Sequence, residues 1–462
     1  MPDVKRTLNL FDTVMIVSGS MIGSGIFIVT ADMTRVLGSP FWVLMCWIVS
    51  GVITLIAALS YGELAGMMPQ AGGQFIYLKR AYGRMVSFVY GWTVFAVIQT
   101  GVIAAVAVAF AKYVGVLAPY FDEKNLLFSM GGFSLSTTQL LAVLVVFFLT
   151  YLNSLGIRNG KMIQRVFTTA KILALLGLIV IGLYYGWNSG VWEQNMELPF
   201  SGGSGNVRMS LYAAMGVALI GSLFSSDAWN NVTFIAGEVK DPKRNIPLGL
   251  LFGVLIVSVL YCLANIAYFM LLPAEQLAHA EGDRVGTAAL RGVFGGSSVL
   301  IMAVLIVVST FGCNNGLILS GSRLFQAMSN EKLFFRSAAN INRHGVPGHA
   351  LWLQASWASV LCLSGSYGAL LDYCTFSSLV FYIITIAALF ILRRREPDTP
   401  RPYRAFGYPV VPAVYILVAG AICVDLLIFK PAAAGLGLLI MLAGWPVYYF
   451  FDRNAKNENV SQ

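Results

Sequence analysis

Long apolar runs recur from one end of the sequence to the other, and they constrain the fold more than any other feature. About 20 apolar residues in a helix cross the hydrocarbon core of a bilayer. Only 11% of the residues are charged, against about 25% in a typical soluble domain. We therefore predict an all-α polytopic membrane protein with twelve transmembrane helices, at 11–35, 40–67, 85–113, 138–155, 163–187, 209–238, 247–272, 295–326, 350–365, 367–392, 409–429 and 433–451. The ninth run is short, and only Gly365-Ser366 separates it from the tenth.

The basic residues gather in alternate connections between these runs. The connections assigned to the inside hold 22 of the 30 basic residues: Lys5, Arg6, Lys79, Arg80, Arg84, Arg158, Lys161, Arg165, Lys240, Lys243, Arg244, Arg323, Lys332, Arg336, Arg343, Arg393, Arg394, Arg395, Arg401, Arg404, Arg453 and Lys456. The other side and its borders hold Arg35, Lys112, Lys124, Arg208, Arg284, Arg291 and Lys430. This bias is typical of membrane proteins with basic cytoplasmic loops. We expect a multi-pass protein of the plasma or bacterial inner membrane, with cytoplasmic tails at 1–10 and 452–462.

Several classes of function are disfavoured by the same residues. The net charge of +9 forms no basic face or tail, and the loop bias accounts for it without a nucleic-acid partner. His279, His344 and His349 lie in polar loops. No intramembrane catalytic cluster is visible, so we expect no metal, no cofactor and no enzymatic activity. Every cysteine lies inside or at the edge of an apolar run, without metal-ligand spacing: Cys46, Cys262, Cys313, Cys362, Cys374 and Cys423.

Two predicted spans contain polar or glycine-rich interruptions. The first carries Gly19-Ser20-Met21-Ile22-Gly23-Ser24-Gly25-Ile26-Phe27, and the sixth carries Phe224-Ser225-Ser226-Asp227-Ala228-Trp229-Asn230-Asn231. Unwound backbone survives in a bilayer only where it lines a cavity or is buried in protein, so both spans are candidates for broken helices. Glycines in the first span have an alternative role in close helix packing. The carboxylate in the sixth favours a functional interpretation.

The spacing of the two breaks predicts an internal repeat. The second break comes five spans after the first, so a second unit of five spans lies upside down relative to the first unit. Matching interruptions in two halves are typical of inverted-repeat transporters, whose sites lie near the membrane midplane. We predict one unit at 11–187, a second at 208–392 and two additional spans at 409–451.

The breaks also predict the chemistry of the ligand. A half-helix that begins near Ser24 presents free N–H groups and a partial positive charge, which suit a carboxylate. Half-helices that end near Ile22 and Phe224 present free carbonyls, which suit a protonated amine. The N–H groups and the carbonyls together match the carboxylate and the amine of an α-amino acid. Polyamines or organic cations would bind only to the carbonyls.

Four stretches together resemble the amino acid–polyamine–organocation superfamily, and within it the L-amino acid transporter branch. They are Gly23-Ser24-Gly25-Ile26-Phe27; Tyr61-Gly62-Glu63-Leu64-Ala65 with Gln70-Ala71-Gly72-Gly73-Gln74; Trp229-Asn230-Asn231 with Gly237-Glu238 and Asp241-Pro242-Lys243; and Arg394-Arg395-Glu396-Pro397 with Arg401-Pro402-Tyr403. The resemblance implies a LeuT-like five-plus-five inverted repeat with helices 1 and 6 broken. It also implies sodium-independent exchange of L-amino acids by alternating access. Proton-coupled uptake of polyamines, organic amines or cationic amino acids is the alternative on this fold.

The resemblance also implies a set of substrate-binding residues. Carried over by position, they are Met21, Ile22, Gly23, Ser24, Gly25, Ile26, Phe224, Ser225, Ser226 and Asp227. The N–H groups of Ser24 and Gly25 would hold the substrate carboxylate. The carbonyls of Met21 and Phe224 would hold the amine, and Phe224 would also close over the substrate.

Two further charged residues are candidates for coupling or gating. Lys171, in the fifth span, matches a lysine that in this branch resembles a substitute for a bound sodium ion. The alternative for Lys171 is snorkelling to the cytoplasmic interface. Glu63 is a buried carboxylate with two possible roles, proton coupling or loop anchoring, of which we favour anchoring.

This chain departs from the family pattern at the sixth span. Ala228 stands where the family commonly has glycine, and Asp227 stands where many carriers of neutral amino acids have glycine. Asp227 either widens specificity toward cationic amino acids or caps a half-helix that starts at Trp229, since Asp is a favoured N-cap. The stretch 113–136 contains no cysteine, so we expect no disulfide-linked heavy subunit of the kind that some members have.

Overall fold

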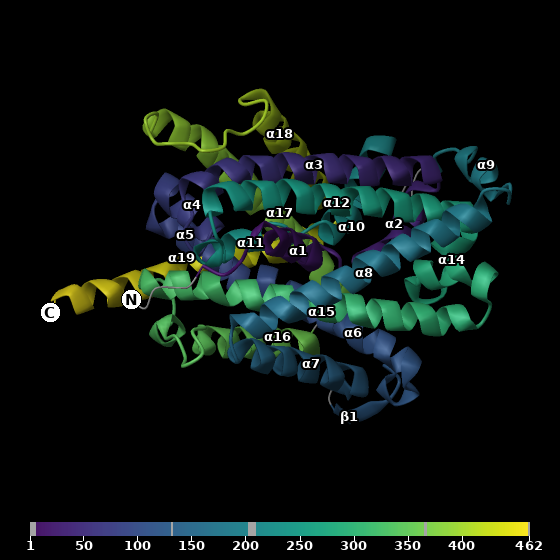
Figure 1. The fold of residues 1–462 in the computed structure, drawn as a ribbon, viewed down its shortest axis with the longest axis horizontal. Coiled ribbons are helices and arrows are strands. Elements are labelled where there is room, and N and C mark those ends of the chain that lie inside the picture. The colour runs from purple at the N-terminus through teal and green to yellow at the C-terminus, as the bar shows by residue number, and fades with distance from the viewer. Residues whose placement is uncertain (1–5, 131–132, 202–208, 365–366, 461–462) are drawn as a thin grey trace.

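The computed structural model describes residues 6–130, 133–201, 209–364 and 367–460, and it is mostly helical (Figure 1). Nine helical stretches in these ranges are long and apolar enough to cross a bilayer. They fall in α3 (Pro40–Met67), α5 (Arg84–Thr93) continued by η2 (Val94–Ile98) and α6 (Gln99–Leu117), α7 (Thr137–Ser154), α8 (Ile157–Gly186), α12 (Pro242–Leu271), α15 (Ser297–Asn330), α17 (Tyr367–Arg395), α18 (Val410–Phe429) and α19 (Pro431–Val460). The chain is a multi-pass membrane protein.

Shorter helices occupy the three other predicted spans. The first span consists of α1 (Leu10–Met21), η1 (Gly25–Phe27) and α2 (Val29–Leu37); the sixth of α10 (Leu211–Ser225) and α11 (Asn231–Phe234); the ninth of α16 (Gly348–Ser364). Both predicted interruptions are therefore present as breaks in helices. The count of twelve crossings stays a prediction. Lys5, Arg208 and Gly365-Ser366, which entered the sequence analysis, lie outside the described residues.

The remaining elements are short and lie in the connections. They are α4 (Gln74–Tyr82), η3 (Pro119–Phe121), β1 (Leu126–Met130), β2 (Phe133–Ser136), α9 (Val191–Met196), η4 (Ala236–Glu238), α13 (Ala274–Ala278), η5 (Glu281–Asp283), α14 (Val285–Phe294) and η6 (Arg336–Ala339). The strands pair as an antiparallel hairpin with Ser129 opposite Ser134. Figure 1 shows α19 reaching one end of the bundle, while α9 and α14 lie at the other.

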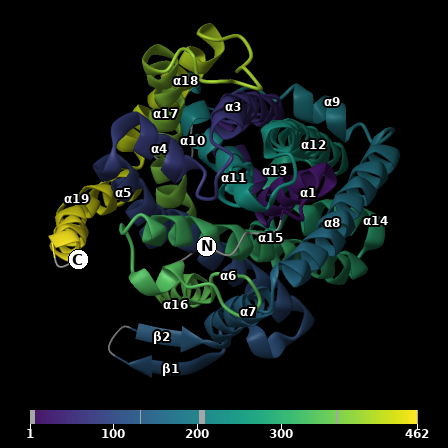
Figure 2. The same cartoon turned by 60° about the vertical axis from the view of Figure 1, so that its left-hand side comes forward.

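The broken helices lie in the interior of the bundle (Figure 2). Helix α1 packs against α8, α12 and α15, and α10 packs against α2, α3, α17 and α18. Every residue from Ile16 to Met21 is buried. Large apolar side chains such as Val180, Leu417 and Leu439 are instead exposed on the outer helices α8, α18 and α19. The surrounding helices thus shield the unwound backbone from lipid, as the absence of water in a bilayer core requires.

Local sequence explains where α1 begins. The Asp12 N–H donates to the Asn9 side chain at 2.9 Å, and the Asn9 N–H donates back to the Asp12 carboxylate at 3.0 Å. This capping box satisfies two N–H groups that a helix start leaves unpaired. The Asp12 carboxylate also pairs with Lys161 of α8 at 2.6 Å and with Arg165, so the start of α1 is fastened to α8.

The short apolar segment after α3 forms the buried helix α4. Before it, Gly72 and Gly73 have φ values of +106° and +46°, a region that residues with a Cβ rarely adopt. The Gly72 N–H donates to the Phe234 carbonyl at 3.0 Å. Gln74 and Phe75 are buried, and α4 packs against α5 and α17. The segment is therefore packed into the bundle beside the broken sixth span.

Candidate binding site at the two broken helices

The first break occupies the three residues between α1 and η1. Helix α1 ends at Met21, and Ile22 is extended with φ −75° and ψ 94°. Ser24 is the N-cap of η1, which begins at Gly25, and the α-helical part of the second half begins only at Val29. The ends of the break match the sequence prediction, although the second half of the span starts as a single 3₁₀ turn. Ser24 in the break and Ile26 in η1 are both buried.

The Lys171 ammonium lies against the carbonyl end of α1. Its Nζ donates to the carbonyl of Gly19, to that of Ile22 at 2.7 Å and to that of Ser309 in α15 at 3.5 Å. Lys171 is only 2% exposed, so the snorkelling interpretation is wrong. The Ser309 hydroxyl is 3.2 Å from the Ile22 carbonyl and 3.1 Å from that of Gly23. The Lys171 ammonium thus donates hydrogen bonds to carbonyls that the end of α1 leaves without backbone partners, and its positive charge is favourable at the negative end of the helix dipole.

The second break separates α10 from the four-residue helix α11. Ser226 is the C-cap of α10, and Ala228 has a positive φ of 67°. Left-handed backbone is disfavoured for residues with a Cβ, which gives a physical reason for the glycine that the family commonly has there. The N-cap of α11 is Asn230. The prediction of a half-helix starting at Trp229 and capped by Asp227 is therefore wrong, because the chain re-enters helix later.

The two breaks touch each other. A Cβ added to Gly25 would lie 2.9 Å from the Ser225 side-chain carbon, so the absence of a side chain at Gly25 permits this contact. The Tyr261 hydroxyl of α12 lies 3.1 Å from the Met21 carbonyl and 3.1 Å from the Ser225 carbonyl. The Phe224 carbonyl accepts the N–H of Asp227 at 3.1 Å. Protein donors thus engage the carbonyls at both helix ends.

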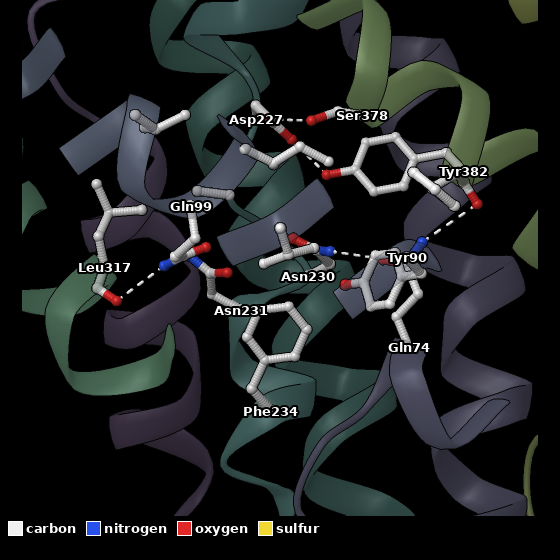
Figure 3. Close-up of a pocket in the computed structure, with 15 residues that line it drawn as sticks. Gln74, Tyr90, Gln99, Asp227, Asn230, Asn231, Phe234, Leu317, Ser378 and Tyr382 are labelled. Atoms are coloured by element: carbon white, nitrogen blue, oxygen red, sulfur yellow. Dashed lines mark hydrogen bonds between the residues drawn. The ribbon is translucent and has the colours of Figure 1, made fainter. Parts of the chain in front are cut away.

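Two cavities adjoin the second break. The first, drawn in Figure 3, is lined by Gln74, Tyr90, Val94, Ile98, Gln99, Val102, Asp227, Ala228, Asn230, Asn231, Phe234, Leu317, Ser378, Phe381 and Tyr382. The second is lined by Ile53, Thr54, Ala57, Leu223, Ser226, Asp227, Trp229, Thr375, Ser378, Leu379, Tyr382 and Tyr415. Asp227, Ser378 and Tyr382 line both cavities.

The Asp227 carboxylate is held between the cavities by neutral donors of α17. It accepts from the Tyr382 hydroxyl and from the Ser378 hydroxyl, the latter at 3.3 Å (Figure 3). The Tyr382 ring packs against Trp229 with centroids 5.2 Å apart. Among the residues described as lining the two cavities, none is basic. A buried carboxylate without a cation is costly, so this site favours a positively charged ligand group or a proton.

The cavity wall beside α4 is a hydrogen-bonded amide network. The Gln74 amide donates to the Thr385 hydroxyl at 2.9 Å and accepts from the Asn230 side chain at 3.1 Å. On the opposite wall the Gln99 amide donates to the Leu317 carbonyl at 2.8 Å (Figure 3). Gln99 follows the π-helical turn η2, and such turns occur often at functional sites.

Glu63 lies away from both cavities, at the end of α3. Its carboxylate pairs with Arg393 at 2.6 Å and Arg401 at 3.2 Å, and it accepts the Ala405 N–H at 2.6 Å. Glu63 is fully buried. These contacts hold the connection between α17 and α18 onto α3, as the anchoring interpretation requires.

A family comparison covers almost the whole chain. The family model described as "Amino acid permease" matches residues 8–450. The chain belongs to this amino acid permease family. The permease is 28% identical over 449 residues to the serine/threonine exchanger SteT of Bacillus subtilis, covering 96% of this chain and 97% of the relative. It is 29% identical to the human large neutral amino acids transporter small subunit 2, covering 96% and 80%. It is 29% identical to the human cystine/glutamate transporter, covering 97% and 85%.

The permease brings the predicted binding residues together but places most of them beside the cavities. Of the ten, Ser226 and Asp227 line a cavity. The predicted residues around the first break instead contact Lys171, Tyr261 and Ser225. Sequence reasoning missed the polar lining residues Gln74, Tyr90, Gln99, Asn230, Asn231, Ser378 and Tyr382. Gln74, Asn230 and Asn231 were in the stretches that carry the resemblance, and this was the available signal.

Proposed function

We propose that this permease exchanges L-amino acids across the cell membrane without sodium, by alternating access around the two breaks. The observation that carries the proposal is the meeting of the breaks, with the Lys171 ammonium on the α1 carbonyls and Tyr261 between the two helix ends. A fixed ammonium at this position supplies the charge that a sodium ion would otherwise bring. The names of the relatives, which include a serine/threonine exchanger and transporters of large neutral amino acids and of cystine and glutamate, support this class of substrate.

The binding residues proposed for the head group remain those of the two breaks. The substrate carboxylate would meet the N–H groups of Ser24 and Gly25, and the amine would meet carbonyls at the ends of α1 and α10. The substrate side chain would extend toward the cavities beside Asp227. Phe224 and Ile26 would exclude water from the head group.

Counterflow in proteoliposomes tests the proposal. We expect labelled amino acids to enter sodium-free vesicles that are preloaded with unlabelled amino acids, at a rate at least about tenfold above that into empty vesicles. An exchanger returns to the other face only with a substrate bound, so empty vesicles take up little label. Equal uptake into both kinds of vesicle would contradict exchange, and no uptake into either would contradict amino acid transport.

Asp227 favours a second candidate function, uptake of cationic amino acids or amines coupled to protons. We expect Asp227→Asn to reduce uptake of lysine or arginine about tenfold or more relative to a neutral amino acid, because hydrogen bonds between charged groups contribute about 1.5–3 kcal/mol. Competition between labelled neutral and cationic substrates measures the ratio. Asp425→Asn in α18 is the control, since Asp425 is absent from the described lining of both cavities. A parallel fall for both substrates would contradict the selectivity role.

The orientation and assembly of the permease are part of the same proposal. Both tails would lie in the cytoplasm, because the inside connections hold most of the basic residues. Units 11–187 and 208–392 would be the inverted repeats, each beginning with its broken helix. The absence of cysteine from 113–136 supports a permease that works without a disulfide-linked heavy subunit.

A further inference from the structure

A third cavity, separate from the two beside Asp227, lies between the C-terminal end of α6, the loop that contains η3 and the connection from η5 to α14. Its volume is about 340 Å³, within the range of about 300–1,000 Å³ for small-ligand pockets. The two cavities beside the second break have volumes of about 20 Å³ each, which is room for about one water molecule. Of these three cavities, the third is therefore the one that can admit an amino acid in this conformation.

This third cavity reaches the first broken span. Ile28 lines it, and the Ile28 N–H donates to the Gly25 carbonyl at 2.9 Å. A Cβ added to Gly286 at the start of α14 would lie 3.4 Å from the Phe27 ring, so this helix packs directly on the first span. Figure 1 shows α14 at the end of the bundle opposite the one that α19 reaches. In the proposed orientation the cavity is therefore an outer vestibule above the first break.

The charges of the vestibule do not all neutralise one another. Five charged residues line it: Lys112, Asp122, Glu123, Asp283 and Arg284. Lys112 pairs with Glu123 at 2.8 Å, and Asp283 pairs at 2.6 Å with Arg35 of α2. Among the residues that the structure describes, Asp122 and Arg284 have no ion-pair partner. One carboxylate and one guanidinium are thus left for a ligand.

Both of these groups are oriented by neutral contacts. The guanidinium carbon of Arg284 lies 5.7 Å from the centroid of the Tyr113 ring, and Tyr113 is only 4% exposed. A guanidinium held over a ring in this way still has N–H donors in a geometry that matches a carboxylate. The Asp122 carboxylate accepts the Lys124 N–H at 2.9 Å, which leaves other acceptor sites on its two oxygens for an ammonium group.

We propose that this vestibule captures zwitterionic amino acids on the outer face, with Arg284 holding the carboxylate and Asp122 the ammonium, before the substrate passes to the breaks. The proposal rests on the proposed amino acid transport and adds a site that only external substrate meets. An ion of a single sign would meet one repulsive charge here, whereas a zwitterion is complementary to both. The Lys112–Glu123 pair takes no part, because its charges already neutralise each other.

The sidedness of a variant tests this proposal. In right-side-out membrane vesicles, we expect Arg284→Gln to raise the half-saturating external concentration of an amino acid about threefold to fivefold, the effect of an ion pair that stays partly open to water. In inside-out vesicles, where substrate arrives from the cytoplasmic face, the half-saturating concentration should stay that of the wild type. An equal rise from both faces would indicate a merely structural role and overturn the proposal, as would no rise from outside.

Arg291→Gln is the matched control for charge. Arg291 lies on α14, is exposed, and is absent from the described lining of the vestibule. The same loss of positive charge on the same connection should leave the external half-saturating concentration unchanged. A rise equal to that of Arg284→Gln would show a general electrostatic attraction and contradict a specific site.

Substrate analogues separate the two ends of the zwitterion. External inhibition by the carboxamide analogue of the substrate, which lacks the carboxylate, should be unaffected by Arg284→Gln. Asp122→Asn gives a second, independent test where Arg284→Gln fails to fold: it should weaken external capture of the amino acid and leave inhibition by the deamino analogue unaffected. Equal losses for the amino acid and the analogue in either variant would contradict the assigned contacts.

Failure of the proposed function gives a different result. Wild-type protein that transports no labelled amino acid in either kind of vesicle contradicts amino acid transport itself. Wild-type protein that transports amino acids, together with Arg284→Gln and Asp122→Asn variants of unchanged external half-saturating concentration, contradicts only the capture site.

Discussion

Replacement of Lys171 with alanine should reduce sodium-free exchange about tenfold or more. The ammonium is buried and donates to the carbonyls of Gly19, Ile22 and Ser309. Hydrogen bonds from a charged group contribute about 1.5–3 kcal/mol each, and about 1.4 kcal/mol corresponds to a tenfold change in an equilibrium. Without the ammonium, the Gly19 carbonyl loses this donor and the Ile22 carbonyl keeps the Ser309 hydroxyl, so the geometry of the first break loosens. Initial rates of counterflow in proteoliposomes measure the effect.

The same variant tests whether the ammonium replaces a cation. If it does, Lys171→Ala creates a space bordered by carbonyls and the Ser309 hydroxyl, which are oxygen ligands that sodium accepts. External sodium should then restore part of the exchange rate. Lys112→Ala is the control, because Lys112 pairs with Glu123 at 2.8 Å and is 38% exposed. Normal exchange by Lys171→Ala, with no response to sodium, would contradict the proposed role.

Replacement of Glu63 with glutamine should be the most destabilising of the proposed changes. Glu63 is fully buried and pairs with Arg393 and Arg401, which are 21% and 7% exposed. Breaking a buried ion pair by removing one partner lowers the free energy of unfolding by about 3–5 kcal/mol, out of about 5–15 kcal/mol for a typical domain. We expect a large fall in the unfolding temperature of detergent-purified protein, measured by intrinsic fluorescence.

An exposed pair provides the comparison for Glu63. Glu396 also pairs with an arginine, Arg80, at 2.5 Å, but the two side chains are 29% and 38% exposed. Surface pairs contribute about 0–1 kcal/mol, so Glu396→Gln should shift the unfolding temperature little. Anchoring by Glu63 further predicts that the surviving Glu63→Gln protein keeps the wild-type dependence of transport on pH. A lost pH dependence at unchanged stability would instead indicate proton coupling.

The positions of the helices were predictable because the bilayer imposes them. An apolar run of about 20 residues has few alternatives to a spanning helix, and the helices α3, α7, α12 and α18 follow the predicted runs closely. The breaks were predictable for a related reason, since glycines and a carboxylate in mid-span are unfavourable unless the helix opens there. The ends of α1 and α10, at Met21 and Ser225, fall at the predicted breaks.

The details of the second break were less predictable. The restart of helix at Asn231 rather than Trp229 depends on the left-handed conformation of Ala228, which no local preference of alanine indicates. Asp227 is consequently turned to Tyr382 and Ser378 of α17 rather than toward a helix start. These two partners are more than 150 positions away in the sequence, and their residue types are common in apolar spans.

The sequence by itself determined the class of protein, the approximate helix positions and the two places where helices open, because composition and local polarity act within one segment. Only the tertiary structure decided which side chains meet at those openings. Lys171, Tyr261 and Tyr382 come from three different helices, and their contacts depend on how α8, α12 and α17 are rotated and packed. A single sequence does not determine how each helix is rotated about its axis, because the same apolar pattern is compatible with several buried faces.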